Sequence, residues 1–412
     1  MTDLEQLGQR AQSASYTLGL LATTQKNRVL AAMATALIAH QDEILAANAQ
    51  DLENPQVPIK FIDRLRLTPE RIQDMATGLK QVAALTDPIG NVDRAWRNEA
   101  GLMIAKERVP LGVIGMIFEA RPNVTVDASA LCFKTGNAVI LRGGKEAIHS
   151  NQALVEVLRS TLRVHEIDEN AIQLITDTTH ATAEKFMQLT DYVDVLIPRG
   201  SARLIQTVLA KATVPVIETG AGNCHVYVDK DAQLAMATDI VINGKVQRPS
   251  VCNATEKLLI HQDVAAEYLP HMIQALRDQG VEVRGDAATQ AIVTDVVPAT
   301  DADWGTEYND LIIAVKVVTS EAAAIAHINR YNTQHSEAIV TDNYRAGKVF
   351  QQRVNAACVY INASTRFTDG FEFGFGAEIG ISTQKLHARG PMGLAALTSY
   401  KYVIDGNGQI RH

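Results

Sequence analysis

The sequence predicts an α/β fold made of two Rossmann-like domains with parallel sheets, together with a separate small β-hairpin element. The chain has 412 residues, which at roughly 150 residues per domain is enough for two or three domains. After Pro110, short apolar runs alternate with helical segments in two successive sets. Apolar strands separated by helices are typical of parallel sheets that are covered on both faces. Segments outside the two sets favour hairpins, so we expect a third, smaller element.

Composition limits the class of partner. Apolar residues make up 47% of the chain and charged residues 20%, and the net charge is −8 with both signs interspersed. Such a chain is globular, and without a basic stripe it is not expected to bind nucleic acid. Its first residues carry charges, and no run approaches ~18 apolar residues, so we expect no signal peptide, no membrane span and no membrane partner. A cytoplasmic location is expected.

The first ninety residues are predicted to form helices. Glycine is rare there, and apolar residues recur at intervals of three and four, which indicates amphipathic helices. From Arg94 to Val109, two short runs around the turn Asn98–Gly101 predict a β-hairpin instead. The clearest helical series is Leu30, Met33, Ala34, Leu37 and Ile38.

The two sets of strands and helices follow the hairpin, and a final strand with an Asn-Gly turn ends the pattern. Strands of the first set are predicted at Leu111–Phe118, Ala138–Leu141, Ile172–Ile175, Val193–Ile197 and Val214–Ile217. Strands of the second set are predicted at Lys257–His261, Leu311–Val318, Ala338–Thr341 and Val359–Ile361, and the final strand at Tyr400–Ile404. Helices between them are predicted at Asn151–Leu162, Ser201–Leu209 and Glu321–Arg330.

Four cysteines are spread along the chain without CxxC spacing, so reduced thiols are expected. Cys132 lies in a helical pattern and Cys358 in a predicted strand, and both are interpreted as core side chains. Cys252 differs, because Arg248-Pro249 should end the preceding helix and leave Cys252 in a loop. A loop thiol beside a cation and exposed backbone amides can become a reactive thiolate. The alternative is a buried structural thiol.

Glu218 opens the segment Glu-Thr-Gly-Ala-Gly-Asn directly after the predicted strand Val214–Ile217. Open α/β sheets bind ligands at the carboxyl ends of their strands. We therefore interpret Glu218 as a candidate general base near the site. A solvated loop acid or a helix cap is the alternative.

Two strand-to-helix junctions are candidate phosphate turns, although neither a GxGxxG nor a Walker A pattern is present. They are Arg142–Lys145, which reads Arg-Gly-Gly-Lys, and Arg199–Ser201, which reads Arg-Gly-Ser. Helix N-termini bind anions, and Arg142 and Lys145 place two cations where an adenosine 2′-phosphate could lie, which predicts NADPH. Ordinary tight turns are the alternative. The eleven histidines show no metal-binding motif, so no metal is expected.

Two motifs carry a resemblance to a known family. Phe118–Asn123 reads Phe-Glu-Ala-Arg-Pro-Asn, and Phe373–Gln384 reads Phe-Gly-Phe-Gly-Ala-Glu-Ile-Gly-Ile-Ser-Thr-Gln. With the pieces above in this order, the chain resembles the aldehyde dehydrogenase superfamily from its N-terminal helices to Tyr400–Val403. It resembles above all the branch that reduces L-glutamyl 5-phosphate with NADPH to the 5-semialdehyde and phosphate, the second step of proline biosynthesis.

The resemblance implies an aldehyde dehydrogenase-like fold and roles for single residues. Cys252 falls on the superfamily nucleophile, and Glu218 falls on the acid that opens its Glu-Leu-Gly-Gly-Lys type segment. Arg142, Gly200, Ser201 and Glu307 are implied in cofactor binding, Glu307 at the acid that holds the nicotinamide ribose. The implied domains are an NADPH-binding domain 1–220 that includes the hairpin 94–109, a catalytic domain 221–395, and strands 396–412 of an oligomerisation element.

Two positions depart from the superfamily pattern. The usual oxyanion-binding Asn is replaced by Ala120, which leaves Arg121, Asn123 and backbone amides as candidate oxyanion donors. The last glycine of the usual Gly-Ser-x-x-x-Gly segment is Ile205, so helix packing there is expected to differ.

The implied mechanism is covalent. The thiolate of Cys252 displaces phosphate to give a thioester, which hydride transfer from NADPH converts to the aldehyde. One alternative is an NAD(P)-dependent hydrolytic aldehyde dehydrogenase, in which Glu218 activates water. The other is a catalytically silent α/β protein that binds a nucleotide.

The resemblance also implies a homo-oligomer, built through the hairpin 94–109 and the strands around 400–410, and functional coupling to glutamate 5-kinase. An isolated two-stranded hairpin is only marginally stable in water, so its edge should be covered, by a neighbouring subunit on this interpretation. The alternative is that the two segments pair with each other inside one chain.

Overall fold

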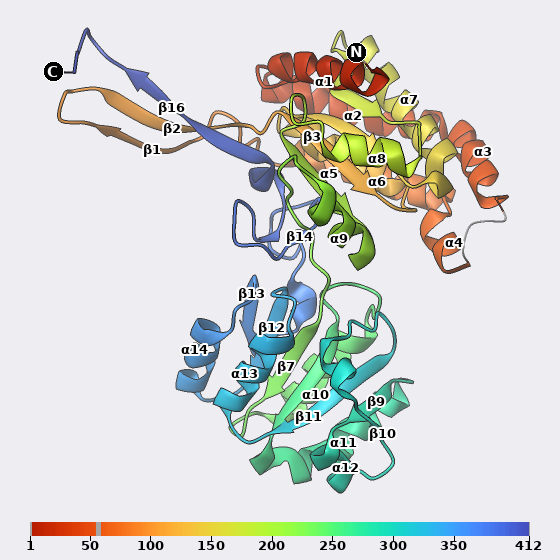
Figure 1. Ribbon diagram of the computed structural model, residues 1–412, viewed down its shortest axis with the longest axis vertical. Helices are drawn as coiled ribbons and strands as arrows, with labels where there is room; N and C mark the ends of the chain where they lie inside the picture. Colours follow the sequence, from red (N-terminus) through yellow and green to blue (C-terminus); the bar gives the residue numbers. More distant parts are fainter. Residues whose placement is uncertain (1, 55–58, 412) are drawn as a thin grey trace. The chain divides into compact units, whose positions relative to one another are not determined.

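The computed structural model describes residues 2–54 and 59–411, and it divides into two compact units (Figure 1). The first unit consists of residues 1–219, 374–380 and 392–412, and the second of residues 220–373 and 381–391. Each unit contains its own parallel sheet, which confirms the predicted α/β class with two Rossmann-like sheets. The short segments 374–380 and 392–395 cluster with the first unit, although the implied catalytic domain included them.

The first unit is built on a four-stranded parallel sheet in the order β5-β4-β3-β6. All residues of β3 (Val113–Phe118) are buried, as expected for a strand covered on both faces. The predicted fifth strand at Val214–Ile217 is wrong, because it pairs only through one bridge between Leu196 and Val216. Pro215 has no N–H to donate, which limits pairing there. The other strands are β4 (Ala138–Arg142), β5 (Ile172–Leu174) and β6 (Val195–Arg199).

Helices cover this sheet and confirm the helical prediction for the first ninety residues. The first helix begins with a capping box, in which Thr2 and Glu5 exchange hydrogen bonds and satisfy amides at the helix start. The second helix packs on the fifth, sixth and seventh, and the sixth contacts β4. The helices are α1 (Asp3–Leu18), α2 (Thr23–Ala39), α3 (Gln41–Leu52), α4 (Ile59–Leu65), α5 (Pro69–Ala84), α6 (Asn123–Lys134), α7 (Ile148–Val164), α8 (His180–Met187) and α9 (Ala202–Lys211).

The second unit contains a seven-stranded parallel sheet in the order β10-β9-β11-β8-β7-β12-β13. Successive residues of its central strands point to opposite faces. Val226 and Leu258 pack in one core with α10 and α11, while Tyr227 and Leu259 pack in another with α13 and α14. The strands are β7 (Cys224–Val228), β8 (Thr255–His261), β9 (Glu282–Gly285), β10 (Val297–Pro298), β11 (Ile312–Val318), β12 (Ser336–Val340) and β13 (Cys358–Ile361).

Three strands of this sheet, β7, β9 and β10, were missed by the sequence prediction. β7 is short, begins directly after a glycine-containing loop and includes His225, so its sequence does not form a continuous apolar run. The helix before Cys252 ends at Val246, ahead of Arg248-Pro249 as predicted. The helices are α10 (Leu234–Val246), α11 (Gln262–Asp278), α12 (Ala287–Ile292), α13 (Glu321–Tyr331) and α14 (Tyr344–Arg353).

A three-stranded antiparallel sheet in the first unit joins distant parts of the chain. The predicted hairpin is confirmed as β1 (Val92–Arg97) and β2 (Met103–Pro110), and β16 (Thr398–Asp405) pairs along the whole of β2. Pairing inside one chain, the alternative interpretation, is therefore what the structure has. The homo-oligomer stays a prediction.

The remaining described elements are short. Strands β14 (Ile381–Ser382) and β15 (Gly390–Pro391) form a two-stranded sheet, and 3₁₀ turns include η1 (Lys145–Ala147), η3 (Asp301–Gly305) and η4 (Thr365–Phe367). Within residues 2–54 and 59–411, no single helix is long and apolar enough to cross a membrane. The pair α2 and α3, bent by 66°, passes that test by length and composition only.

Candidate active site

The carboxyl ends of β3, β4 and β6 meet at one edge of the first-unit sheet. The parallel register pairs Ile117 with Arg142 and Phe118 with Arg199. Because each phosphate turn directly follows its strand, the two predicted turns lie on either side of the segment that follows β3. The structure thus brings together two sites that are far apart in the sequence.

Glu119, the first residue after β3, lies between these two turns. A Cβ atom added at Gly144 would lie 3.5 Å from the Cα of Glu119, and one added at Gly200 would lie 2.8 Å from its carboxyl carbon. The N–H of Ser201 donates to one oxygen of Glu119 at 2.9 Å, and its hydroxyl donates to the other at 2.7 Å. Ser201 is also the N-cap of α9. Sequence reasoning missed Glu119, because its partner is 82 residues away.

Arg142 and Lys145, the predicted 2′-phosphate ligands, have different surroundings. A terminal nitrogen of Arg142 donates to the carbonyl of Thr178 at 2.6 Å. Burial lowers the pKa of Arg142, and the nearby acids Glu146 and Asp177 oppose this effect. Lys145 begins η1 and is exposed. Lys145 therefore reaches solvent freely, while Arg142 is partly engaged by the protein.

The candidate oxyanion donors follow Glu119. The N–H of Arg121 donates to the carbonyl of Glu119 at 2.7 Å. Asn123 begins α6, and its side-chain amide donates to Asp127 at 3.0 Å. Burial raises the pKa of Asp127 to about 6, and the hydrogen bond from Asn123 and the charge of Arg199 oppose the shift. Asp127, which the sequence analysis did not single out, is thus an acid that titrates near neutrality beside Asn123.

Glu218 lies at the end of the segment that runs beside β6. Ile217 donates its N–H to the carbonyl of Leu196 at 2.9 Å, and the hydroxyl of Thr219 donates to the carbonyl of Pro198 at 2.7 Å. These two contacts fix the backbone on both sides of Glu218. Burial raises the pKa of Glu218, which makes its carboxylate a stronger base than an exposed one.

Cys252 lies in the second unit, in the loop between α10 and β8. It is half-buried, whereas Cys132, Cys224 and Cys358 are buried, and none of the four forms a disulfide bond. The core interpretation of Cys132 and Cys358 is confirmed. Burial raises the pKa of the Cys132 and Cys224 thiols, which disfavours their thiolates. Cys252 therefore has the most accessible thiol of the four.

The loop before β7 packs directly against the backbone of Cys252. A Cβ atom at Gly222 would lie 1.4 Å from the carbonyl oxygen of Cys252, so only glycine fits there. The thiol of Cys224 donates to the same carbonyl at 3.2 Å. The N–H of Gly222 donates to the carboxylate of Glu307 at 2.7 Å, and the side chain of Asn223 donates to two backbone carbonyls at 2.8 Å each. Gly222 thus contacts both the backbone of Cys252 and the carboxylate of Glu307.

A second cation, Arg366 in η4, lies in electrostatic reach of Cys252. The side-chain amide of Asn253 donates to the carbonyl of Thr368 at 2.9 Å, and the guanidinium of Arg366 donates to the side-chain oxygen of Asn253. Burial lowers the pKa of Arg366, the charge of Arg248 adds to that effect, and Cys252 opposes it. Sequence reasoning named Arg248 and missed Arg366, which comes from a segment more than a hundred residues away.

Buried charged side chains next to the Cys252 loop hold the backbone on both sides of Glu307. Lys245 and Glu256 form a fully buried ion pair at 3.2 Å. Glu256 accepts from the N–H of Tyr308 at 3.2 Å, and Lys257 donates to the carbonyl of Thr306 at 2.7 Å. Burial raises the pKa of Glu256 and lowers those of Lys245 and Lys257. The residues flanking Glu307 are therefore held by side chains of β8 that lie four and five positions after Cys252.

The predicted site residues fall into two groups. Glu218 and the candidate oxyanion and phosphate ligands belong to the first unit, whereas Cys252 and Glu307 belong to the second. The second group lies at the amino ends of β7, β8 and β11. Among the residues that the structure describes, no group of three or more His, Cys, Asp or Glu side chains could hold a metal ion.

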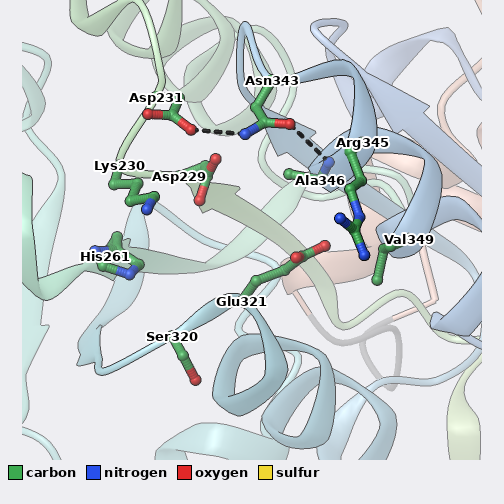
Figure 2. Close-up of a pocket in the computed structure, with 10 residues that line it drawn as sticks. All are labelled: Asp229, Lys230, Asp231, His261, Ser320, Glu321, Asn343, Arg345, Ala346 and Val349. Atoms are coloured by element: carbon green, nitrogen blue, oxygen red, sulfur yellow. Dashed lines mark hydrogen bonds between the residues drawn. The ribbon is translucent and has the colours of Figure 1, made fainter.

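A cavity of about 400 Å³ lies at the opposite, carboxyl edge of the second sheet (Figure 2). It contains none of the predicted site residues, and two of its acids are already engaged. Asp231 accepts from the side chain of Asn343 at 2.9 Å, and Asp229 accepts from Thr341 at 2.7 Å. The lining residues are Asp229, Lys230, Asp231, His261, Ser320, Glu321, Asn343, Arg345, Ala346 and Val349.

Comparison with known proteins identifies the family to which the chain belongs. The sequence model of the aldehyde dehydrogenase family matches residues 1–301. The chain belongs to the aldehyde dehydrogenase family. It is an oxidoreductase of that family, and the family implies a nicotinamide cofactor.

Its relatives within the family are gamma-glutamyl phosphate reductases. That of Lactiplantibacillus plantarum is 90% identical over 412 residues, which cover 100% of both chains. That of Enterococcus faecalis is 64% identical over 414 residues, covering 100% of this chain and 99% of the relative. The crystal structure of the gamma-glutamyl phosphate reductase of Thermotoga maritima has a TM-score of 0.98 at 48% identity and covers 100% of both chains. The resemblance proposed from the two motifs is thereby confirmed.

Proposed function

We propose that the chain reduces L-glutamyl 5-phosphate with NADPH to L-glutamate 5-semialdehyde and inorganic phosphate, the second step of proline biosynthesis from glutamate. The names of the full-length relatives support the substrate. The observation that carries the chemistry is Cys252, a half-buried thiol in a loop held by Gly222 and flanked by cations. Cations near a thiol stabilise its thiolate, the nucleophilic form.

The proposed reaction begins at Cys252. Its thiolate attacks the carbonyl carbon of the acyl phosphate, the carbon–oxygen bond to phosphate breaks, and phosphate leaves with the bonding electrons. The acyl group remains on Cys252 as a thioester. When bound, NADPH supplies a hydride to the thioester carbon, after which the carbon–sulfur bond breaks and the thiolate is regenerated. A covalent nucleophile divides one difficult step into two easier ones.

The residues at the edge of the first sheet fit a dinucleotide. Ser201 has an N–H and a hydroxyl at the start of α9, and in this structure both donate to Glu119. Donors of this kind at a helix start also bind phosphate oxygens. Arg142 and Lys145 supply positive charge at the neighbouring turn, and we infer that they favour the 2′-phosphate of NADPH. Glu307 is proposed to hold the nicotinamide ribose, as the acid at that position does in the superfamily.

Glu218, Arg121 and Asn123 are proposed to act around the thioester. Arg121 and Asn123 are candidate donors to the oxyanion, since Ala120 replaces the usual Asn. We propose that Glu218 moves protons at the thiol of Cys252, a role that its raised pKa supports. The same raised pKa also favours the second candidate, a hydrolytic NAD(P)-dependent aldehyde dehydrogenase in which Glu218 activates water.

The reverse reaction distinguishes these candidates. Glutamate 5-semialdehyde and NADP⁺ are mixed with the enzyme, and NADPH formation is followed with and without inorganic phosphate. A reductase needs phosphate as the acyl acceptor, so turnover should rise from near zero in proportion to phosphate. Turnover that does not depend on phosphate would identify the hydrolytic enzyme, and no turnover in either condition would identify a silent protein.

We infer two further properties. A homo-oligomer built through β1, β2 and β16 is supported by the position of β16 at the edge of its sheet and by its exposed Tyr400, Tyr402 and Ile404, because an open strand edge can pair with another chain. A cytoplasmic location suits a reduced thiol nucleophile. Functional coupling to glutamate 5-kinase would deliver a hydrolysis-prone acyl phosphate directly to the enzyme.

A further inference from the structure

The N-terminus of α9 is filled by a carboxylate of the chain itself. Both oxygens of Glu119 accept from Ser201, one from its N–H at 2.9 Å and the other from its hydroxyl at 2.7 Å. Gly200 has no room for a side chain, because a Cβ atom there would lie 2.8 Å from the carboxyl carbon of Glu119. The Gly-Ser pair therefore receives an anion that is already part of the protein.

Both hydrogen bonds to the Glu119 carboxylate come from Ser201, at the start of α9. α9 contains ten residues, enough for its dipole to favour a negative charge at its start. The carboxylate is thus held by the same N–H, hydroxyl and dipole that a phosphate group would use.

One set of donors cannot bind two anions at once. We propose that Glu119 competes with the phosphates of the nicotinamide dinucleotide for the N-terminus of α9, and that this competition lowers the affinity for the cofactor. The inference rests on the proposed function, since it concerns the dinucleotide. It adds a residue that sets cofactor affinity and that no role assigned above includes.

If Glu119 instead helped to bind the cofactor, replacing it would change the affinity for NADPH in the opposite direction. An acid after a strand can also bind a dinucleotide by accepting hydrogen bonds from a ribose hydroxyl. Removing the charge of such a ligand weakens binding, whereas removing a competitor strengthens it. The change in the dissociation constant therefore decides between the two roles.

Direct binding tests this inference without turnover. NADPH is titrated into the wild type and Glu119→Gln in the absence of acyl phosphate, and its fluorescence is followed at low and high salt. The glutamine retains an oxygen that accepts from Ser201 but carries no charge. We expect Glu119→Gln to bind NADPH about tenfold more tightly at low salt, with a smaller gain at high salt, where charge repulsion is screened.

Glu184→Gln is the matched control, because Glu184 is an acid of the same unit that pairs with Lys211 at the other end of α9 and is not among the residues proposed to hold the cofactor. Its effect should be much smaller. Inorganic pyrophosphate, a probe without nicotinamide, should displace NADPH more effectively from Glu119→Gln than from the wild type. Equal or weaker NADPH binding by a folded Glu119→Gln would overturn the inference, and so would an equal gain in Glu184→Gln. Failure of the wild type to bind NADPH would contradict the proposed function instead.

Discussion

The backbone N–H of Gly222 donates to a carboxylate oxygen of Glu307 at 2.7 Å. The other side of Gly222 faces the carbonyl of Cys252, where a Cβ atom would overlap the oxygen at 1.4 Å. A single glycine therefore connects the backbone of the proposed nucleophile to the acid proposed to hold the nicotinamide ribose. Both contacts lie within the second unit, so they are maintained by that unit alone.

Replacing this glycine should damage the site. Gly222→Ala forces the Cys252 loop or the Glu307 loop to move, and overpacking of this kind costs roughly 1–3 kcal/mol. We expect a lower free energy of unfolding and slower alkylation of Cys252 by iodoacetamide. Gly305→Ala is the control, because nothing lies within 4 Å of a Cβ atom there. Equal behaviour of the two variants would contradict the bridging role of Gly222.

Replacing Cys252 should remove the chemistry and keep the fold. Cys252→Ala should form no acyl-enzyme detectable by mass spectrometry and should show no phosphate-dependent turnover, with little change in thermal unfolding. Cys132→Ala is the contrasting variant: its thiol is fully buried, so we expect turnover to continue and stability to fall by roughly 1–2 kcal/mol. Substantial turnover by Cys252→Ala would assign the nucleophile elsewhere.

The cofactor preference should depend on Arg142. A charge-assisted contact to the 2′-phosphate contributes roughly 1.5–3 kcal/mol, so Arg142→Ala should raise the KM for NADPH far more than the KM for NADH. The lost hydrogen bond to Thr178 should lower stability slightly, which thermal unfolding measures separately. Equal changes for the two cofactors would place the 2′-phosphate away from Arg142.

Asp127 should make stability depend on pH. Its pKa is raised from 3.8 to about 6 in the folded protein, so the folded state binds this proton more tightly than the unfolded state does. The free energy of unfolding therefore falls as pH rises through this interval and stays lower above it. Asp127→Asn lacks this penalty and can still accept from Asn123. Its Tm relative to the wild type should be higher by a few degrees at about pH 8 than at about pH 4.

Removing the last strand should test assembly. Deleting Ser399–His412 takes away nearly all of β16 and exposes the paired edge of β2. If the three-stranded sheet joins subunits, the mass measured by light scattering should fall to that of a smaller species. An unchanged oligomer with only lowered stability would restrict the sheet to a role within one chain.

The fold was largely predictable because its signals are local. Apolar runs such as those around β3 and β11 are long and preceded by turn residues, so their strands were identified from the sequence. The errors arose where the local pattern is weak or misleading. Pro215 interrupts the apolar run Val214–Ile217, and the missed strand β7 carries His225. Whether such a segment is a strand depends on its pairing in the folded sheet, and the length of an apolar run does not reveal that pairing.

The candidate site was predictable only in part, for a different reason. Cys252, Glu218 and the phosphate turns each have a recognisable sequence context. Arg366 has none, and the motif that contains Glu119 does not indicate its contact, because Glu119 meets Ser201 across 82 residues and Arg366 meets Asn253 across 113. Such pairs depend on which strand ends and loops the topology places together. No spacing along the chain encodes that information.

The pairing of β2 with β16 has a consequence for the order in which the protein is made. Thr398 pairs with Pro110, and the whole main segment of the second unit, residues 220–373, lies between them in the chain. During synthesis the edge of β2 that pairs with β16 therefore stays unpaired until that segment has been made. Contacts between residues so distant in the chain also form slowly. An open strand edge favours association with other chains. Newly made chains should consequently depend on chaperones most strongly before residues 398–405 have been added.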